Sequence, residues 1–325
     1  MPGDPQLAEL LAKASISDVA PLIAQGIDRR DFGIVTSCFA PEAQATFQQH
    51  KASGRDAIIR HLRGGDLFTG SSRLVTSFHL VGQQSINLVG NHAKAETHVV
   101  KFERVAQLEG LVDRVQGTRW SDELVQHQGR WLIQRQQVSV DWTRADAVVA
   151  PPLQAIPVMS SPAEGWVLPT APLDVRRLQN DESAAARYLQ DREAIREVLT
   201  RWYDGCNVRD MDIIASCYTP DTEGEYRADW LLGVAGAIGK IQLIKNSLGF
   251  INLMGNYLVR IEGDVASAQT YYIQHSRRGA AGQVMDMRSG MRILYQMART
   301  GEQWLIKRIV IGPDWSRLDA LRETA

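Results

Sequence analysis

The chain repeats one short segment at two places. Residues 37–42 read SCFAPE, and residues 216–221 read SCYTPD, 179 positions further along. Both follow an Arg-Asp pair at the same distance, Arg30-Asp31 in the first case and Arg209-Asp210 in the second. Such a repeat constrains the fold more than composition does, because each copy must supply a structural unit of the same design.

The repeat continues through the rest of each copy. Segment 78–82 (FHLVG) matches 251–255 (INLMG), and the closing segment 130–142 (RWLIQRQQVSVDW) matches 303–315 (QWLIKRIVIGPDW). These matches have an offset of 173, so the first copy contains six more residues than the second before this part. The chain is therefore an internal duplication of about 130 residues per copy.

A proline-rich stretch separates the copies. Six of the twelve prolines lie between positions 151 and 172, and such a stretch predicts an extended linker because proline cannot continue a helix or a central strand. We expect an N-terminal domain at 1–145, a linker at 146–180 and a C-terminal domain at 181–325. The length of 325 residues also favours two domains over one core.

Composition and charge exclude several classes of protein. A net charge of −1 indicates no basic surface for nucleic acid or an anionic membrane, and no apolar run is long enough to span a bilayer. The N-terminus lacks the features of a secretory signal, so we expect a cytoplasmic protein. The three cysteines form no C-x-x-C, and no ligand spacing or nucleotide-binding glycine pattern predicts a metal or a cofactor.

Each copy begins with helices and ends with strands. Apolar periodicity predicts a helix over 18–30 in the first copy and over 182–208 in the second. We expect a short second helix to carry the SCF or SCY residues and to stop at the following proline, and a third to start near Gly54 or Gly233. The remaining segments predict antiparallel strands. The fold class is thus α+β, with a curved antiparallel sheet wrapped on helices in two tandem cone-shaped barrels.

The order of motifs resembles a known family. Each copy has a helix, an R-D-x-x-x-x-x-S-C-[FY]-x-P-[DE] segment, a glycine-led helix, an A-x-A-x-T strand and a closing W-L-I-x-R hairpin. This order resembles the SnoaL-like branch of the NTF2-like superfamily, which includes polyketide cyclases and has scytalone dehydratase, a dehydrochlorinase and ketosteroid isomerase as relatives. The resemblance implies two cones with one open mouth each. It implies no single chemistry, because the same fold also carries epoxide hydrolases and non-catalytic proteins.

The resemblance implies a catalytic pair in the first copy. Similar dehydratases and eliminases use an aspartate three residues before the Arg-Asp aspartate and a histidine on the H-x-x-G strand, which here are Asp28 and His79. A neutral imidazole can remove a proton from carbon near pH 7, and a carboxylate can orient it. The alternative is a solvated aspartate at a helix end and a hydrogen-bonded histidine in the sheet. A separation within about 5 Å would favour catalysis over binding alone.

The second copy departs from this pattern. Asn207 and Asn252 replace the aspartate and the histidine, and asparagine cannot act as a base near neutral pH. Asn252, Tyr272 and His275 are candidates for a different substrate-binding pocket in this copy. A structural or ligand-shaping role is the alternative for Tyr272 and His275.

Three residues of the first copy are further candidates for binding a substrate. Strand alternation places Glu103 on the same face as Thr97, and similar dehydratases have a pocket histidine near the place of Glu103. Trp120 fits an aromatic-x-Asp pattern of the family, and Phe39 is the aromatic residue of SCFAPE. A surface ion pair is the alternative role for Glu103, and a core position is the alternative for Trp120.

These residues together predict a cofactor-independent lyase or isomerase of the dehydratase or eliminase type. An apolar cyclic small molecule would enter the first domain, where His79 would remove a C–H proton. A non-catalytic small-molecule-binding or scaffold protein is the alternative. Epoxide hydrolysis would need a water-binding Asp, Asn and Arg set, which the sequence does not reveal. We expect an intramolecular pseudo-dimer as the assembly, with a further homodimer left open.

Overall fold

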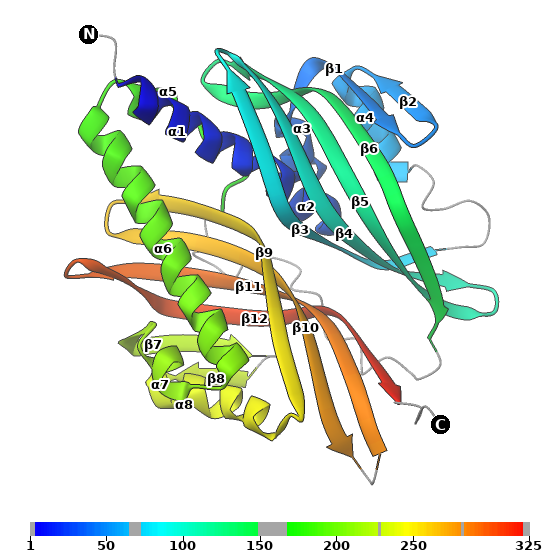
Figure 1. The fold of residues 1–325 in the computed structure, drawn as a ribbon, viewed down its shortest axis with the longest axis vertical. Coiled ribbons are helices and arrows are strands. Elements are labelled where there is room, and N and C mark those ends of the chain that lie inside the picture. The colour runs from blue at the N-terminus through cyan, green and yellow to red at the C-terminus, as the bar shows by residue number, and fades with distance from the viewer. Residues whose placement is uncertain (1–3, 65–72, 149–167, 227–228, 281–282, 321–325) are drawn as a thin grey trace. The chain divides into compact units, whose positions relative to one another are not determined.

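The computed structural model describes residues 4–64, 73–148, 168–226, 229–280 and 283–320. They form two compact units, each with its own six-stranded sheet (Figure 1). Unit 1 consists of Met1–Val148 and Pro169–Leu189, and unit 2 consists of Val149–Leu168 and Gln190–Ala325. The predicted α+β class with two tandem units is confirmed, but both sheets are open and neither closes into a barrel.

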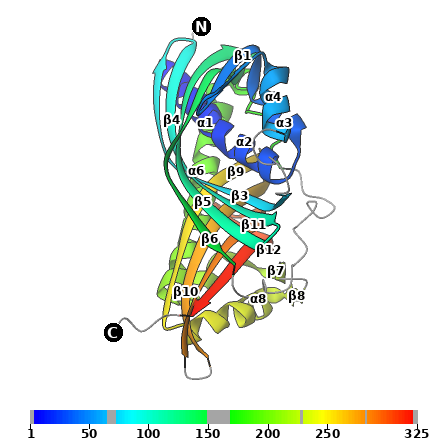
Figure 2. The same cartoon turned by 90° about the vertical axis from the view of Figure 1, so that its right-hand side faces the viewer.

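Unit 1 combines helices with a curved sheet. The strand order is β2-β1-β6-β5-β4-β3, and all neighbours are antiparallel except β1 and β6, which run parallel. Figure 2 shows the long strands curving, with α2, α3 and α4 on the inner side of the curve. The elements are α1 (Pro5–Ser17), α2 (Val19–Asp28), α3 (Phe32–Ser37), β1 (Phe39–Phe47), β2 (His50–Ser53), α4 (Arg55–Gly64), β3 (Arg73–Val89), β4 (His92–Gln107), β5 (Gly110–His127) and β6 (Arg130–Ala147).

Unit 2 repeats this topology with the strand order β8-β7-β12-β11-β10-β9. Its first helix, α6, covers the predicted range 182–208, and its opening residues up to Leu189 belong to unit 1. After the short helix α5 (Arg176–Gln179), the elements are α6 (Glu182–Val208), α7 (Met211–Ala215), β7 (Tyr218–Tyr226), β8 (Asp229–Leu232), α8 (Gly233–Ile241), the 3₁₀ helix η1 (Gln242–Asn246), β9 (Gly249–Glu262), β10 (Val265–Ala280), β11 (Gln283–Thr300) and β12 (Gln303–Ala320).

The second helix of each unit is shorter than predicted. α3 ends at Ser37 and Cys38 is its C-cap, so β1 already begins at Phe39. The prolines of the repeated segment therefore lie within strands β1 and β7 and do not stop the helices. Pro41 is tolerated because the ladder between β1 and β6 is interrupted between Phe39 and Gln44.

A bulge bends the sheet at the same place in both units. The pairing register shifts between Gly117 and Thr118 in β5, and after Gly290 in β11. The indole of Trp142 lies over Gly117 and that of Trp315 over Gly290, so close that a Cβ on either glycine would overlap the ring as it now lies. Since a bulge increases local bending, a glycine covered by a tryptophan is the shared device that curves both sheets.

The predicted linker falls largely on residues 149–167, which lie outside the described residues. Before it, β6 continues to Ala147. After it, Val175 is buried in a small cluster with Leu11 and Ala185, within unit 1. Residues 169–180 are thus part of the packing of unit 1.

Candidate active site

The side chains of Asp28 and His79 meet inside unit 1. Asp28 is the last residue of α2, and His79 lies in β3. Asp28 Oδ1 is 2.6 Å from His79 Nδ1, and Oδ2 accepts the backbone N–H of His79 at 2.9 Å. The hydroxyl of Ser77 donates to Oδ1 at 3.0 Å. The aspartate side chain is 0% exposed and the imidazole 5%, so the pair is held away from bulk water.

Close helix packing fixes the position of Asp28. A Cβ on Gly26 would lie 2.6 Å from Val35 Cγ2 and 2.9 Å from the carbonyl oxygen of Asp31. α2 and α3 therefore approach more closely than a larger residue would permit. Arg30, with a φ of 58°, then turns the chain out of α2.

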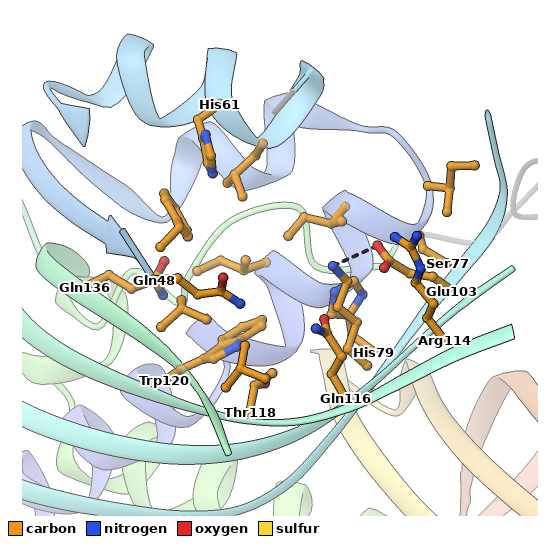
Figure 3. A pocket seen from close by; sticks show the side chains of 18 of the residues that line it. Gln48, His61, Ser77, His79, Glu103, Arg114, Gln116, Thr118, Trp120 and Gln136 are labelled. Atoms are coloured by element: carbon orange, nitrogen blue, oxygen red, sulfur yellow. Dashed lines mark ion pairs between the residues drawn. The ribbon is translucent and has the colours of Figure 1, made fainter. Parts of the chain in front are cut away.

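His79 faces a cavity of about 310 Å³ inside unit 1 (Figure 3). Its walls come from α2, α4, β1 and the inner face of the sheet. The apolar lining residues are Ile23, Ile27, Phe47, Leu62, Leu74, Trp120, Val138 and Val140. The polar and charged ones, besides His79, are Arg30, Gln48, His61, Ser77, Lys101, Glu103, Arg114, Gln116, Thr118 and Gln136.

Glu103 belongs to a charged end of this cavity. Its carboxylate is 2.7 Å from Lys101 Nζ, the ion pair marked by the dashed line in Figure 3. The two residues are two positions apart in β4, so strand alternation, which identified Glu103, also provides a signal for Lys101. Arg114 and Gln116 were not predicted, because their place depends on the pairing of β5 with β4.

Trp120 and Gln136 form the opposite end of the cavity (Figure 3). The Trp120 ring is 5% exposed, and its centroid is 6.3 Å from that of His79. Gln136 Nε2 donates to the buried Asp122 carboxylate at 2.9 Å. Burial raises the pKa of Asp122 to about 7, and the hydrogen bond from Gln136 opposes this rise.

Phe39, the remaining candidate of the first copy, lies in the core of unit 1. It is the first residue of β1, is 0% exposed and pairs with Ile133 of β6, which is also 0% exposed. Its ring is therefore a core side chain and is not one of the residues that line the cavity. The structure thus brings Glu103 and Trp120 to the cavity of His79, but not Phe39.

Unit 2 keeps the contact between helix and strand without the imidazole. Asn207 Oδ1 accepts the backbone N–H of Asn252 at 2.7 Å, and Asn207 Nδ2 donates to the Asn252 carbonyl at 3.2 Å. Asp28 makes the same bond to the backbone of His79 in unit 1. This hydrogen bond therefore holds the first helix to the sheet in both units, whereas the carboxylate–imidazole contact exists only in unit 1.

Several aromatic side chains lie in the core of unit 2. Tyr203 OH is 2.7 Å from Thr270 Oγ1, which is 3.2 Å from Tyr295 OH. Burial raises the pKa of both tyrosines well above the ordinary value, so the hydroxyls stay protonated. Tyr272 is 5% exposed and packs edge-on against Tyr203, with the ring centroids 5.3 Å apart. Tyr272, predicted to bind substrate, is thus a core residue in the structure.

The side chain of His275 does not lie beside that of Tyr272. The two are three positions apart in β10, so alternation places them on opposite faces of the sheet. His275 is exposed, and its pKa is lowered by partial burial and by the nearby Arg288. Asn252 is buried and bonded to Asn207 through its backbone. The three residues predicted as a pocket in this copy therefore have separate surroundings.

The described part of the chain holds no cluster of metal ligands and no exposed cysteine. Within it, no group of three or more His, Cys, Asp or Glu side chains is placed to hold a metal ion. The cysteines are buried, and burial raises the pKa of Cys38 to about 12, so its thiol is protonated at neutral pH. No described helix has both the length and the apolar composition that crossing a membrane requires.

The fold and the motif order define a class of α+β proteins in which helices cover one face of a curved sheet. The model of the SnoaL-like domain matches residues 8–137 and again residues 187–310. These matches cover well over half of the chain. The chain therefore belongs to the SnoaL-like domain family and contains two copies of the domain.

The following relatives and solved structures each match less than half of the chain. Uncharacterized proteins of Mycobacterium tuberculosis and Mycobacterium bovis are 31% identical over 86 residues, which is 25% of this chain and 57% of theirs. A hexachlorocyclohexane dehydrochlorinase structure is 16% identical, with a TM-score of 0.40, over 46% of this chain and 99% of its own. Another such dehydrochlorinase, from Novosphingobium barchaimii, is 15% identical, with a TM-score of 0.38, over 42% of this chain and 93% of its own.

Proposed function

We propose that unit 1 is the catalytic part of a lyase or isomerase that removes a proton from carbon in an apolar cyclic small molecule. The proposal rests on the buried Asp28–His79 pair, with 2.6 Å between carboxylate and imidazole, at the wall of a cavity that has both apolar and polar lining residues. A buried carboxylate that holds an imidazole is an arrangement that suits general base catalysis.

Asp28 determines which ring nitrogen of His79 acts on the substrate. Its carboxylate holds the proton on Nδ1, because a carboxylate only accepts hydrogen bonds. Nε2 is then the basic nitrogen. As the proton moves to Nε2, the negative charge of Asp28 stabilises the imidazolium that forms.

The reaction follows from this proton transfer. The substrate C–H bond breaks as Nε2 takes the proton, and the electron pair of that bond forms a new double bond. In an elimination, the bond to a neighbouring leaving group breaks and that group departs with its electron pair. In an isomerisation, the imidazolium returns the proton to another carbon. General base catalysis of this kind contributes about 10²–10⁴-fold.

Unit 2 has a supporting role in this proposal. Asn207 and Asn252 preserve the hydrogen bond to the strand but supply no base, and Tyr203, Tyr272 and Tyr295 occupy the interior. We infer that unit 2 acts as a scaffold and does not turn over substrate.

Deuterium incorporation tests the proposal. The protein is incubated in deuterium oxide with 2-tetralone and other cyclic ketones, and uptake at the carbon next to the carbonyl is followed by mass spectrometry. We expect His79→Gln to reduce enzymatic uptake by about 10²–10⁴-fold, and Asn252→Gln, the matched change in unit 2, to leave it unchanged. Full uptake with His79→Gln would contradict the proposal.

A further inference from the structure

Charged side chains line one end of the cavity of unit 1. Arg114 and Glu103 pair directly across β5 and β4, and in the next row inward Gln116 pairs with Lys101, which pairs with His79 of β3. Figure 3 shows Arg114 and Glu103 at one end of the cavity, and Trp120 and Gln136 at the other. Lys101 thus lies in the same row of the sheet as the proposed base, and Glu103 and Arg114 lie in the neighbouring row on the same face.

The positive charges at this end are only partly neutralised. Lys101 and Glu103 pair with each other at 2.7 Å. Within the described residues, Arg114 forms no ion pair, although it is only partly exposed. Arg30, which is exposed, adds another positive charge to the lining. The lining residues therefore carry an excess of positive charge in a partly buried space, where a bound anion would be stabilised.

The fold does not require these charges. The positions 173 residues further along hold Gln274 for Lys101, Ser276 for Glu103 and Met287 for Arg114. Unit 2 forms the same sheet without the three charges.

One ion pair in the same strands, unlike the charges at the cavity, is present in both units. Arg104 and Asp113 of unit 1 recur as Arg277 and Asp286 of unit 2, and both pairs are bonded. This cross-strand pair is thus kept in both units, whereas the charges of Lys101, Glu103 and Arg114 occur only beside His79. This contrast points to a ligand for the second set.

We propose that the cavity binds a carboxylate of the substrate at Arg114 and Lys101, so that the substrate is an apolar ring acid. The inference rests on the proposed function and specifies its substrate class. A guanidinium matches a carboxylate with two parallel N–H donors. Neighbouring strands are about 4.8 Å apart, so a carboxylate held here places an adjacent ring carbon near His79. The apolar wall, including Ile27, Leu74 and Val138, covers the rest of the ring.

Paired probes test this inference by binding alone. Isothermal titration calorimetry compares 2-naphthoate with 2-naphthamide, which has nearly the same shape but no charge. We expect the carboxylate to bind about 10- to 100-fold more tightly, as a charge-assisted hydrogen bond implies. Arg114→Met should abolish this preference, and methionine is compatible with the fold because Met287 holds the same position in unit 2. Arg277→Met, an identical change at an exposed arginine, should leave it intact.

A catalytic variant separates this inference from the proposed function. His79→Gln should lose deuterium uptake and keep the preference for the carboxylate. Equal affinities of the two probes for the unmodified protein would overturn the inference while leaving base catalysis by His79 in place. A preference that survives in both Arg114→Met and Arg114→Gln would also overturn it. Circular dichroism establishes that each variant is folded before titration.

Discussion

Asp28 binds His79 twice, through the backbone N–H at 2.9 Å and through the imidazole Nδ1 at 2.6 Å. The first bond has a counterpart in unit 2, between Asn207 and the backbone of Asn252 at 2.7 Å. The second bond has no counterpart in unit 2, because Asn252 has no imidazole. The duplication therefore separates the part of this contact that holds the fold from the part available for chemistry.

Asp28→Asn should separate the two roles by experiment. Asparagine can still accept the backbone N–H, as Asn207 does, so we expect a melting temperature close to that of the unmodified protein. It cannot hold the same tautomer or stabilise an imidazolium, so deuterium uptake should fall by about 10²–10⁴-fold. Asn207→Asp is the matched control and should leave uptake unchanged. Full uptake with Asp28→Asn would show that His79 needs no carboxylate.

The two equivalent ion pairs should differ in their contribution to stability. The Arg104–Asp113 pair is buried, with side chains 6% and 2% exposed, whereas Arg277 and Asp286 are 50% and 35% exposed. Arg104→Met removes the guanidinium that pairs with the buried Asp113 carboxylate and should lower the free energy of unfolding by about 3–5 kcal/mol. Arg277→Met should change it little, because water screens that pair. Urea denaturation measures both, and equal losses would contradict the burial argument.

Asp122 should make unit 1 less stable as pH rises. Burial raises its folded pKa from the ordinary 3.8 to about 7, so between these values the folded state binds a proton that the unfolded state has lost. The free energy of unfolding then falls with increasing pH through this window and levels off above it. From pH 5 to pH 8, Asp122→Asn should gain stability relative to the unmodified protein by on the order of 2–3 kcal/mol. Urea denaturation at a series of pH values measures this gain, and a gain that stays constant between pH 5 and pH 8 would contradict the raised pKa of Asp122.

The glycines under the two tryptophans should tolerate alanine unequally. A Cβ at Gly117 or Gly290 would overlap the indole of Trp142 or Trp315. Trp142 is 49% exposed and can move aside, whereas Trp315 is 8% exposed and is confined by its neighbours. Gly290→Ala should therefore cost more than Gly117→Ala, by about 1–3 kcal/mol. The midpoint of chemical denaturation measures this difference. A larger loss of stability in Gly117→Ala than in Gly290→Ala would contradict the claim that Trp315 cannot move aside.

Much of the fold could be predicted from the sequence because the duplication presents each signal twice. The two units and the helix over 182–208 agree with the structure, since they depend on local periodicity. α1 was missed although its start carries a recognisable signal. Asp4 accepts the backbone N–H of Gln6, and Pro5 occupies the first position of the helix.

The candidate site was predicted only in part because it depends on contacts between strands. Asp28 and His79 came from the motif order, and Glu103 came from strand alternation. Arg114 reaches the cavity only through the pairing of β5 with β4, which no local pattern specifies. Phe39 was misplaced because the residues after Cys38 were interpreted as helix, whereas they begin β1.

A crystal structure with a bound ligand tests the central claim, that unit 1 is the working unit, most directly. Crystals would be soaked with a panel of apolar cyclic carbonyl and hydroxy compounds. We expect ligand density in the cavity of unit 1, with a ring carbon about 3–3.5 Å from His79 Nε2, the distance of a reactive complex. Density only in unit 2, near Asn252 and Tyr272, would contradict the claim and assign the function to the other copy.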